Sequence, residues 1–194
     1  MDRLTQFPEA ETEAASKEES STRPAGFDWP AFTGLSGELL TQSAWAEGLA
    51  RWLKLKPGRL GAEPVDWLEQ AKQSIQRSQV TVLHLSQVAE AAFGGSASEK
   101  EAALRRWDAE VFQPLWSWMS GTFTQPRLLV TPSIGVHTGA GVYLPGPVPF
   151  AMAGYRVRSV VPRRMTEADA ELTDLKIDRG HELLEYYLFS GTRH

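Results

Sequence analysis

The sequence has no cysteine among its 194 residues. This excludes disulfide bonds, thiolate metal ligands and a cysteine nucleophile. It also has no run of 18 apolar residues, so no membrane-spanning helix is expected. The first residues, Met1–Gln6, carry charge but are not followed by the apolar core of a signal peptide. We therefore expect a cytoplasmic protein without a membrane span.

Histidine is scarce, and the common catalytic signatures are missing. No two of the four histidines stand at metal-ligand spacing. The stretch His181–Glu185 begins like the zinc motif H-E-x-x-H but ends in glutamate, so the second ligand is missing. No segment matches G-x-x-x-x-G-K-[ST] or G-x-G-x-x-G. We predict no metal and no cofactor, and the sequence alone does not identify an activity.

A strong charge of one sign is lacking too, because 20 basic and 24 acidic residues give a net charge of −4. Residues 1–25 hold six acidic and three basic residues, which accounts for −3 of this total. Such a polar segment cannot bury enough apolar surface to offset its ordering entropy. We expect a disordered acidic tail over residues 1–25 and a single domain over residues 26–194.

The longest amphipathic stretch is Pro64–Phe93, whose apolar residues recur at steps of three, four and seven. This spacing predicts one long helix that starts at a favourable proline and closes at Gly94. Within it, Gln79–Leu85 is rich in β-branched residues and is an alternative strand. We favour the helix, because no turn residue separates this run from its flanks.

Further helices are predicted on both sides of this stretch. In Glu38–Leu55, Trp45, Leu49 and Trp52 share one face with Leu53, which predicts a core-facing stripe that ends at Pro57-Gly58. A capping box at Ser98 and Glu101 predicts a helix through Phe112 that Pro114 bends or ends. Residues 36–120 are therefore predicted to form a helical part of about three helices.

The composition changes after residue 123, where proline and glycine alternate with β-branched residues. Three strands are predicted, over Arg127–Thr131, Gly141–Leu144 and Phe150–Val161. Thr166 with Asp169 predicts the start of a helix. Glu182–Phe189 fits a last helix or a last strand, and we favour the helix, because Asp178 can cap it and Gly191 can end it. The fold prediction is α+β: a helical N-terminal half packed on a small, mostly antiparallel sheet over residues 123–194, with a C-terminal helix.

Seven tryptophans are many for this length. Most are expected in the core, but one or two are candidates for an exposed partner surface, because tryptophan is enriched at interface hot spots. We place the predicted surface at two aromatic residues near the tail and at a cluster of basic residues. Its members are Trp29, Phe32, Arg156, Arg158, Arg163 and Arg164. For Trp29 the alternative is a place in the core.

The glycine-rich loop Ser133–Gly141 is the most site-like stretch. Its glycines allow backbone amides to converge on an anion, and His137 within it is a weak candidate for a general base. No serine or carboxylate is tied to His137 by sequence. An irregular connection between strands is the simpler interpretation.

Three functional hypotheses follow. The first is a non-enzymatic interaction or structural subunit of a larger assembly of phage-like, secretion or mobile-element type, with protein partners and self-association into a homo-oligomer as expectations. The second is a small hydrolase or transferase that uses His137. The third is a nucleic-acid-binding module that uses the arginine cluster of residues 156–164.

Overall fold

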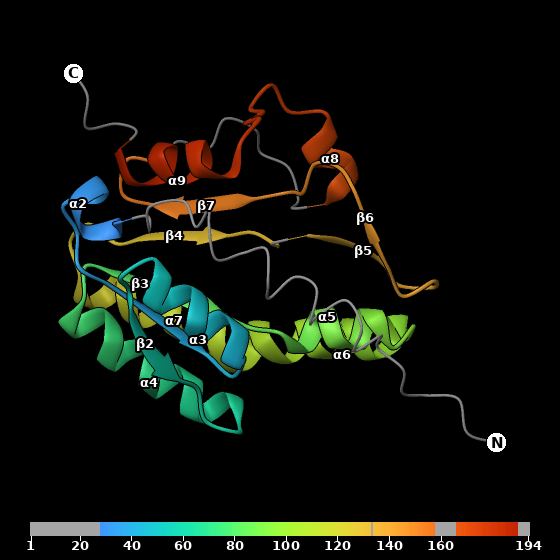
Figure 1. Cartoon of the computed structure of the whole chain (residues 1–194), viewed down its shortest axis with the longest axis horizontal. Helices are drawn as coiled ribbons and strands as arrows, with labels where there is room; N and C mark the ends of the chain where they lie inside the picture. The colour runs from blue at the N-terminus through green and yellow to red at the C-terminus, as the bar shows by residue number, and fades with distance from the viewer. Residues whose placement is uncertain (1–27, 133, 158–165, 190–194) are drawn as a thin grey trace, which may run out of the picture. The chain divides into compact units, whose positions relative to one another are not determined.

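The structure is a computed structural model that describes residues 28–132, 134–157 and 166–189 (Figure 1). The predicted acidic tail, residues 1–25, lies outside the described residues. Contacts divide the chain into two compact units. The first comprises the described residues up to Leu60 with Gln73–His84, and the second comprises Gly61–Lys72 with the described residues from Leu85 onward. The chain mixes helices and strands, which confirms the α+β class; the single domain over 26–194 stays a prediction.

The first unit is built on a parallel sheet with the strand order β2-β1-β3. At Glu38, β1 is paired with Lys56 of β2 on one side and with Thr81 of β3 on the other. Helix α3 connects β1 to β2, and α4 precedes β3. The bounds are α2 Trp29–Thr33, β1 Gly37–Thr41, α3 Ala44–Trp52, β2 Lys56–Arg59, α4 Pro64–Arg77 and β3 Val80–His84.

The helix predicted over Glu38–Leu55 is wrong in its first part, because Gly37–Thr41 is a strand and helix α3 covers only Ala44–Trp52. β1 is the central strand, and it is buried along nearly its whole length. A strand buried on both faces shows no alternation, so a short apolar run does not distinguish it from a helix. The predicted helical part of residues 36–120 therefore contains a parallel sheet.

The segment Lys56–Arg59, expected to end a helix and begin a loop, forms strand β2. Pro57 lies opposite Leu39 in this strand. Proline has no N–H to donate, so it is tolerated in a sheet only where one side of the strand needs no partner. β2 meets this condition, because it lies at the edge of the sheet.

The single helix predicted over Pro64–Phe93 is also wrong. The stretch forms α4, then β3, then α5 (Gln87–Phe93). Val80–His84 pairs along its whole length with β1, so the strand alternative is the observed one. This pairing joins residues about forty positions apart, and such tertiary contacts override local periodicity. The left-handed residue after α5 is Gly95, with φ 76°, and not the predicted Gly94.

The core of the first unit lies around the central strand. Trp29 of α2 donates its backbone N–H to the carbonyl of Leu53 (3.2 Å), which fixes α2 beside the end of α3. Asp28 caps α2 by accepting from the amide of Ala31. The buried apolar residues are Trp29, Leu39, Leu40, Ala46, Ala50, Leu55 and Leu60.

The helices of the second unit follow α5. Figure 1 shows α6 and α7 as neighbouring parts of one long helical stretch. The described bounds are α6 Ala97–Trp107, a π-helical segment η1 Asp108–Phe112, and α7 Gln113–Thr122. Ser96 caps α6 by accepting from the amide of Glu99 (3.2 Å), so the capping serine is two residues before the predicted Ser98.

Pro114 does not end this stretch, because it lies in the first turn of α7, where proline is tolerated. The π segment before it affects which residues of the stretch are buried. The buried residues of the stretch, Trp107, Val111, Leu115 and Met119, recur at every fourth position. In a regular α-helix each such step rotates the side chain by about 40°, so the row would leave the core. A wider π turn absorbs part of this rotation. Trp107 then meets Trp67 of α4 edge to face, with ring centroids 6.4 Å apart.

An antiparallel pair in the second unit confirms the predicted pairing of Arg127–Thr131 with Phe150–Val161. β4 (Arg127–Val130) pairs with β7 (Ala151–Gly154). β7 ends earlier than predicted, at Gly154, which has φ 114°. A Cβ atom there would lie 2.1 Å from the carbonyl oxygen of Pro126, so only glycine fits.

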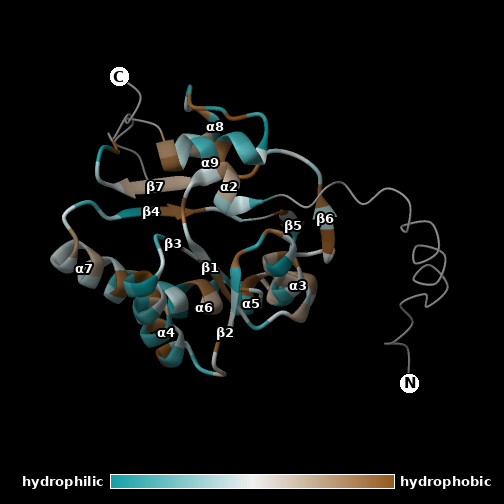
Figure 2. Cartoon of the chain, turned by 60° about the vertical axis from the view of Figure 1, so that its left-hand side comes forward, coloured by the Kyte–Doolittle hydropathy of each residue, from teal (hydrophilic) through white to brown (hydrophobic). Residues whose placement is uncertain are grey.

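A second antiparallel pair is the hairpin of β5 (Gly135–His137) and β6 (Val142–Leu144). All three residues of β6 are exposed, and Figure 2 shows this strand as strongly hydrophobic. Tyr143 meets Phe93 of α5 edge to face, with ring centroids 4.8 Å apart. This contact holds the hairpin against α5.

Two further helices confirm the predictions for the C-terminal part. Thr166 caps α8 (Glu167–Glu171) by accepting from the amide of Asp169 (3.1 Å). α9 covers Gly180–Phe189. Arg127 Nη1 donates to the carbonyl of Tyr187 (2.6 Å), whose hydroxyl donates to the Arg127 carbonyl (2.9 Å), so α9 is tied to β4.

Across the described ranges, no helix combines the length and the apolar character that crossing a membrane requires.

Candidate functional site

Helix α3 presents its large apolar residues outward. Trp45 is 71% exposed and Trp52 is 43% exposed. They are seven residues apart, and therefore lie on one face of the helix. The side toward the core carries Ala46 and Ala50 instead, both almost fully buried. The predicted core-facing stripe is thus inverted, because small side chains let the helix lie close to the sheet.

Gly48 lies between the two tryptophans on the same face. The positions Trp45, Gly48, Leu49 and Trp52 follow the spacing i, i+3, i+4 and i+7 of a helical stripe. Among the described residues, a Cβ added at Gly48 would meet nothing within 4 Å, so packing in this part of the chain does not require glycine there. Glycine inside a helix costs roughly 0.5–1 kcal/mol relative to alanine. We call these four residues the α3 stripe.

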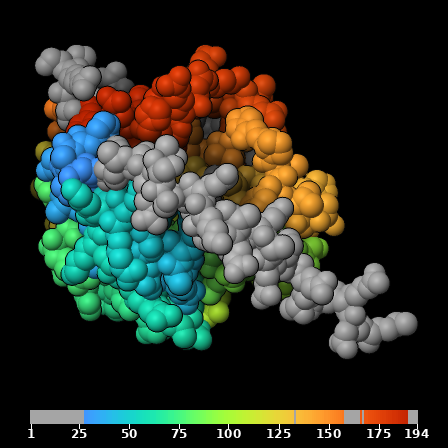
Figure 3. All heavy atoms as spheres, in the orientation of Figure 1, coloured from blue at the N-terminus to red at the C-terminus, as the bar shows by residue number. Residues whose placement is uncertain are grey.

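The ends of α3 are well defined, which makes the stripe rigid. Ser43 caps the start by accepting from the amide of Ala46 (3.4 Å). At the end, Lys54 takes a left-handed conformation (φ 56°), and the amide of Leu55 donates to the carbonyl of Ala50 (2.9 Å). Asp28 forms an ion pair with Lys54 at this end. Figure 3 shows the segment that includes α3, in light blue to cyan, at the surface of the face drawn.

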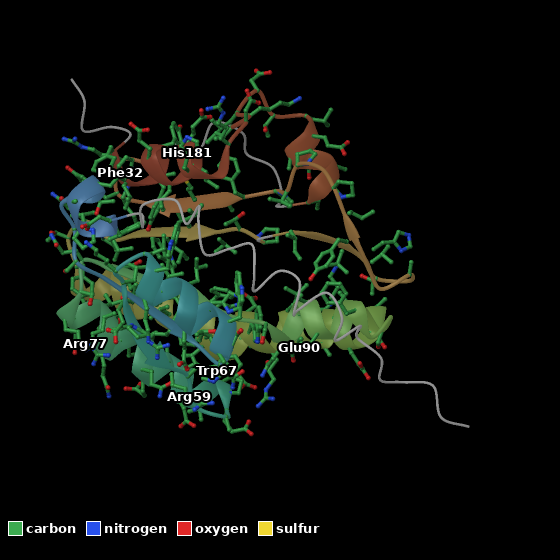
Figure 4. The ribbon with its side chains drawn as sticks, in the orientation of Figure 1. Phe32, Arg59, Trp67, Arg77, Glu90 and His181 are labelled. Carbon is green, nitrogen blue, oxygen red and sulfur yellow. The ribbon has the colours of Figure 1, made fainter. Side chains whose placement is uncertain are left out.

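A buried carboxylate lies on the central strand β1. Glu38 is 1% exposed. Arg77 of α4, labelled in Figure 4, donates to both of its oxygens at 2.8 Å, and Ser74 donates to one of them at 2.8 Å. The hydrogen bonds from Arg77 hold the pKa of Glu38 below its usual 4.5, against the opposing effect of burial. Both of these hydrogen-bond donors belong to α4, so the cluster attaches α4 to the central strand of the sheet.

Thr41 and His84 meet at the carboxyl ends of β1 and β3. The Thr41 hydroxyl and His84 Nδ1 are 2.9 Å apart, and the amide of Ser43 donates to the same hydroxyl (3.0 Å). Burial lowers the pKa of His84 from its usual 6.5, so the ring is neutral at pH 7. Ligands often bind at this edge of parallel sheets. Thr41 is fully buried, however, so its contact with His84 stabilises the pairing of β1 with β3.

The partner residues predicted from sequence have different surroundings. Trp29 is 3% exposed and belongs to the core of the first unit, which was the alternative interpretation, so its indole is not an exposed anchor. Phe32 is 51% exposed. Arg156 lies 5.2 Å over the ring of Tyr155. Arg158, Arg163 and Arg164 lie outside the described residues, so their role stays a prediction.

His137 lies in β5 at the start of the turn to β6. Its Nδ1 accepts a hydrogen bond from the amide of Ala140 (3.1 Å), so the ring stabilises the turn. The side chain is exposed, and no described serine or carboxylate is hydrogen-bonded to it. The glycine-rich loop is therefore a connection between strands for its described residues, since Ser133 lies outside them. His181 is exposed in the first turn of α9, as expected for a surface helix start.

Among the residues that the structure describes, no three histidine, aspartate or glutamate side chains are grouped so that they could hold a metal ion.

Comparison with known proteins adds a fold relationship. No family model matches the chain, and no curated protein matches it. Among solved structures, the chain is similar to the PH0037 protein from Pyrococcus horikoshii, with a TM-score of 0.75 and 15% sequence identity. The match covers 86% of this chain and 51% of PH0037, so the chain spans about half the length of that protein. At this identity the likeness shows the fold alone.

Sequence reasoning expected one or two tryptophans to be exposed but did not single out Trp45 and Trp52. The sequence did contain a sign of which face of α3 contacts the sheet. Ala46 and Ala50 stand on one face and Gly48 on another, and a helix that must approach a sheet closely uses small residues where it makes contact. Periodicity reports only that apolar residues share a face and not which face turns inward.

Proposed function

We propose that this chain is a non-enzymatic interaction subunit of a larger protein assembly, and that the α3 stripe is its binding surface. The observation that supports the proposal is the exposure of both Trp45 and Trp52 on one face of a capped helix. Tryptophan is the residue type most enriched among those that dominate binding energy. Two such rings on one face are costly to leave in water unless they are covered in the assembled state.

The magnitude is sufficient for binding. A full tryptophan buries up to about 250 Å². With the observed exposures, covering both rings would contribute roughly 5 kcal/mol or more of gross apolar burial at about 25 cal/mol per Å². Association has its own entropic cost, so a partner must also contact the residues around the rings.

The other parts of the proposal come from the sequence. A cytoplasmic location and an assembly of phage-like, secretion or mobile-element type are expectations of that kind. A nucleic-acid partner for the arginine cluster of residues 156–164 stays a prediction as well. The α3 stripe carries no charge, so it favours a protein partner over a phosphate backbone.

The test uses the full chain as bait in affinity capture. Trp45→Glu places a charge on the stripe at an exposed position, so the fold is retained. Val65→Glu is the matched control, since Val65 is also exposed but lies on α4. Partners that bind the wild type and Val65→Glu but not Trp45→Glu would support the proposal. Partners retained equally by both variants, or a chain that neither captures a partner nor associates with itself, would overturn it.

A further inference from the structure

We infer that the partner of the α3 stripe is a second copy of this chain, bound through an antiparallel α3–α3 contact. This inference rests on the proposed function and names the occupant of the same surface. It starts from the order of residues along the stripe, which has large residues at its ends and a small and a large residue at its centre.

The positions of the stripe are the same when the helix direction is reversed, and its two central residues then face each other as a large and a small one. Trp45 and Trp52 are equally far from the point between Gly48 and Leu49. A twofold axis through that point would place each Trp45 against the Trp52 of the second copy, and each Leu49 against its Gly48. Contacts of this kind, in which residue i meets j and j meets i, are what a twofold dimer requires.

Gly48 has a purpose in this arrangement that it lacks within one chain. No described residue outside the backbone of α3 and the neighbours of Gly48 lies within 4 Å of its missing Cβ atom. In the dimer, the vacant volume above Gly48 receives Leu49 of the second copy, which fills the gap between the indoles. A small residue at a helix contact allows close backbone approach, and this offsets the propensity lost by placing glycine in the helix.

The chemistry of the stripe also selects an apolar partner. None of its four residues is charged, and the ion pair Glu47–Arg51 is formed within α3 itself. An acidic or basic peptide would find no opposite charge on the stripe. A second copy presents a surface of the same apolar character and of the same length.

The area suggests a weak dimer. The exposed parts of the two indoles amount to roughly 280 Å² per chain if a whole tryptophan exposes about 250 Å². Two chains would therefore bury on the order of 600 Å² from the rings, with further area from Gly48 and Leu49. Specific interfaces below about 1,200 Å² are typically transient, so we expect dissociation in the micromolar range.

The test is sedimentation velocity on the full chain from about 5 to 500 µM. We expect a concentration-dependent monomer–dimer equilibrium. Trp45→Glu should weaken it at least 30-fold, as expected for a hot spot, whereas Val65→Glu should leave it unchanged. A chain that stays monomeric at every concentration, or a dimer that Trp45→Glu does not weaken, would overturn the inference.

A complementary pair of variants tests the register. Gly48→Leu should crowd the homodimer, because two leucines then meet twice, and Leu49→Ala should leave it underpacked. In a mixture of the two, the new leucine at position 48 of one chain faces the new alanine at position 49 of the other. The second contact of the mixed dimer is the native one, between Leu49 and Gly48, so mixed dimers should form more tightly than either homodimer. Equal or weaker association of the mixture would overturn the antiparallel register. Thermal melts of each variant confirm that it is folded.

The two proposals fail differently. If the chain remains monomeric but captures another protein in a Trp45-dependent manner, the second copy is wrong and the interaction function stands. If the chain neither dimerises nor captures a partner through Trp45, both are wrong.

Discussion

At the scale of the residue, Arg77 stabilises the first unit by neutralising the buried carboxylate of Glu38. Arg77→Met keeps much of the aliphatic stem but leaves Glu38 with Ser74 and a distant Lys56, whose nitrogen is 3.9 Å away. The Arg77 side chain is 46% exposed, so solvent screens part of the loss, and the cost should lie below that of breaking a fully buried ion pair. We expect a loss in the free energy of unfolding that is larger than the loss caused by Lys56→Met, measured by urea denaturation at pH 7.

Lys56→Met is the matched control, since it removes the other cation near the same carboxylate. The Lys56 side chain is largely exposed, so its loss should cost less than about 1 kcal/mol. A double variant, Glu38→Met with Arg77→Met, should recover much of the loss, because an apolar pair has no unpaired charge. Equal costs for Arg77→Met and Lys56→Met would contradict the assigned role of Arg77.

Trp29 allows a second test at this scale. Its Nε1 is buried without a hydrogen-bond partner among the described residues, and an unsatisfied buried donor costs about 1–3 kcal/mol. Trp29→Phe removes that donor and leaves only a small gap, so stability should change by less than about 1 kcal/mol. Trp29→Ala should cost about 3–5 kcal/mol through the cavity. Thermal and urea unfolding measure both; a Trp29→Ala protein that melts like the wild type would show that Trp29 is not core.

At the scale of the element, the sequence predicted the helices and strands that depend on residues close together in the chain. The helix start at Thr166 depends on residues three apart, and the strand Arg127–Val130 shows as an apolar run between turn residues, so both were found. β1 and β3 were missed, because each is a strand only through pairing with residues far along the chain. The α3 stripe was found as a pattern but assigned to the wrong side, since periodicity does not state which face meets the sheet.

The end of β7 gives a prediction at this scale. Gly154→Ala would place a methyl group 2.1 Å from the Pro126 carbonyl oxygen and would force alanine to φ 114°. Such strain costs about 1–3 kcal/mol before the clash is counted, so we expect at least 2 kcal/mol of destabilisation in thermal unfolding. Gly121→Ala in α7 is the control: among the described residues its added Cβ meets nothing within 4 Å, and the variant should gain about 0.5–1 kcal/mol of stability. The reverse order would contradict the described turn.

At the scale of the whole molecule, one buried carboxylate and two partly buried rings define how stability should depend on pH. Burial lowers the pKa of His84 from 6.5, so the unfolded chain binds the proton more tightly than the fold does, and stability falls as the pH drops below about 6.5. Glu38 has a pKa below 4.5, so its contribution is complete above 4.5 and is lost as the pH falls through the lower value of the fold.

Tyr187 sets the opposite limit. Burial raises its pKa above 10.0, despite the nearby charge of Arg127, so the neutral phenol is favoured and stability falls as the pH rises above about 10. The melting temperature should therefore be highest between about pH 6.5 and pH 10. The acid limit belongs to the first unit and the alkaline limit to the second, since His84 and Tyr187 lie in different units.

Circular dichroism melts across this pH range test the assignments. His84→Asn should reduce only the fall in melting temperature near pH 6, and Tyr187→Phe should reduce only the fall at alkaline pH. A single variant that removed both limits, or a wild type whose stability rises below pH 6, would contradict these assignments.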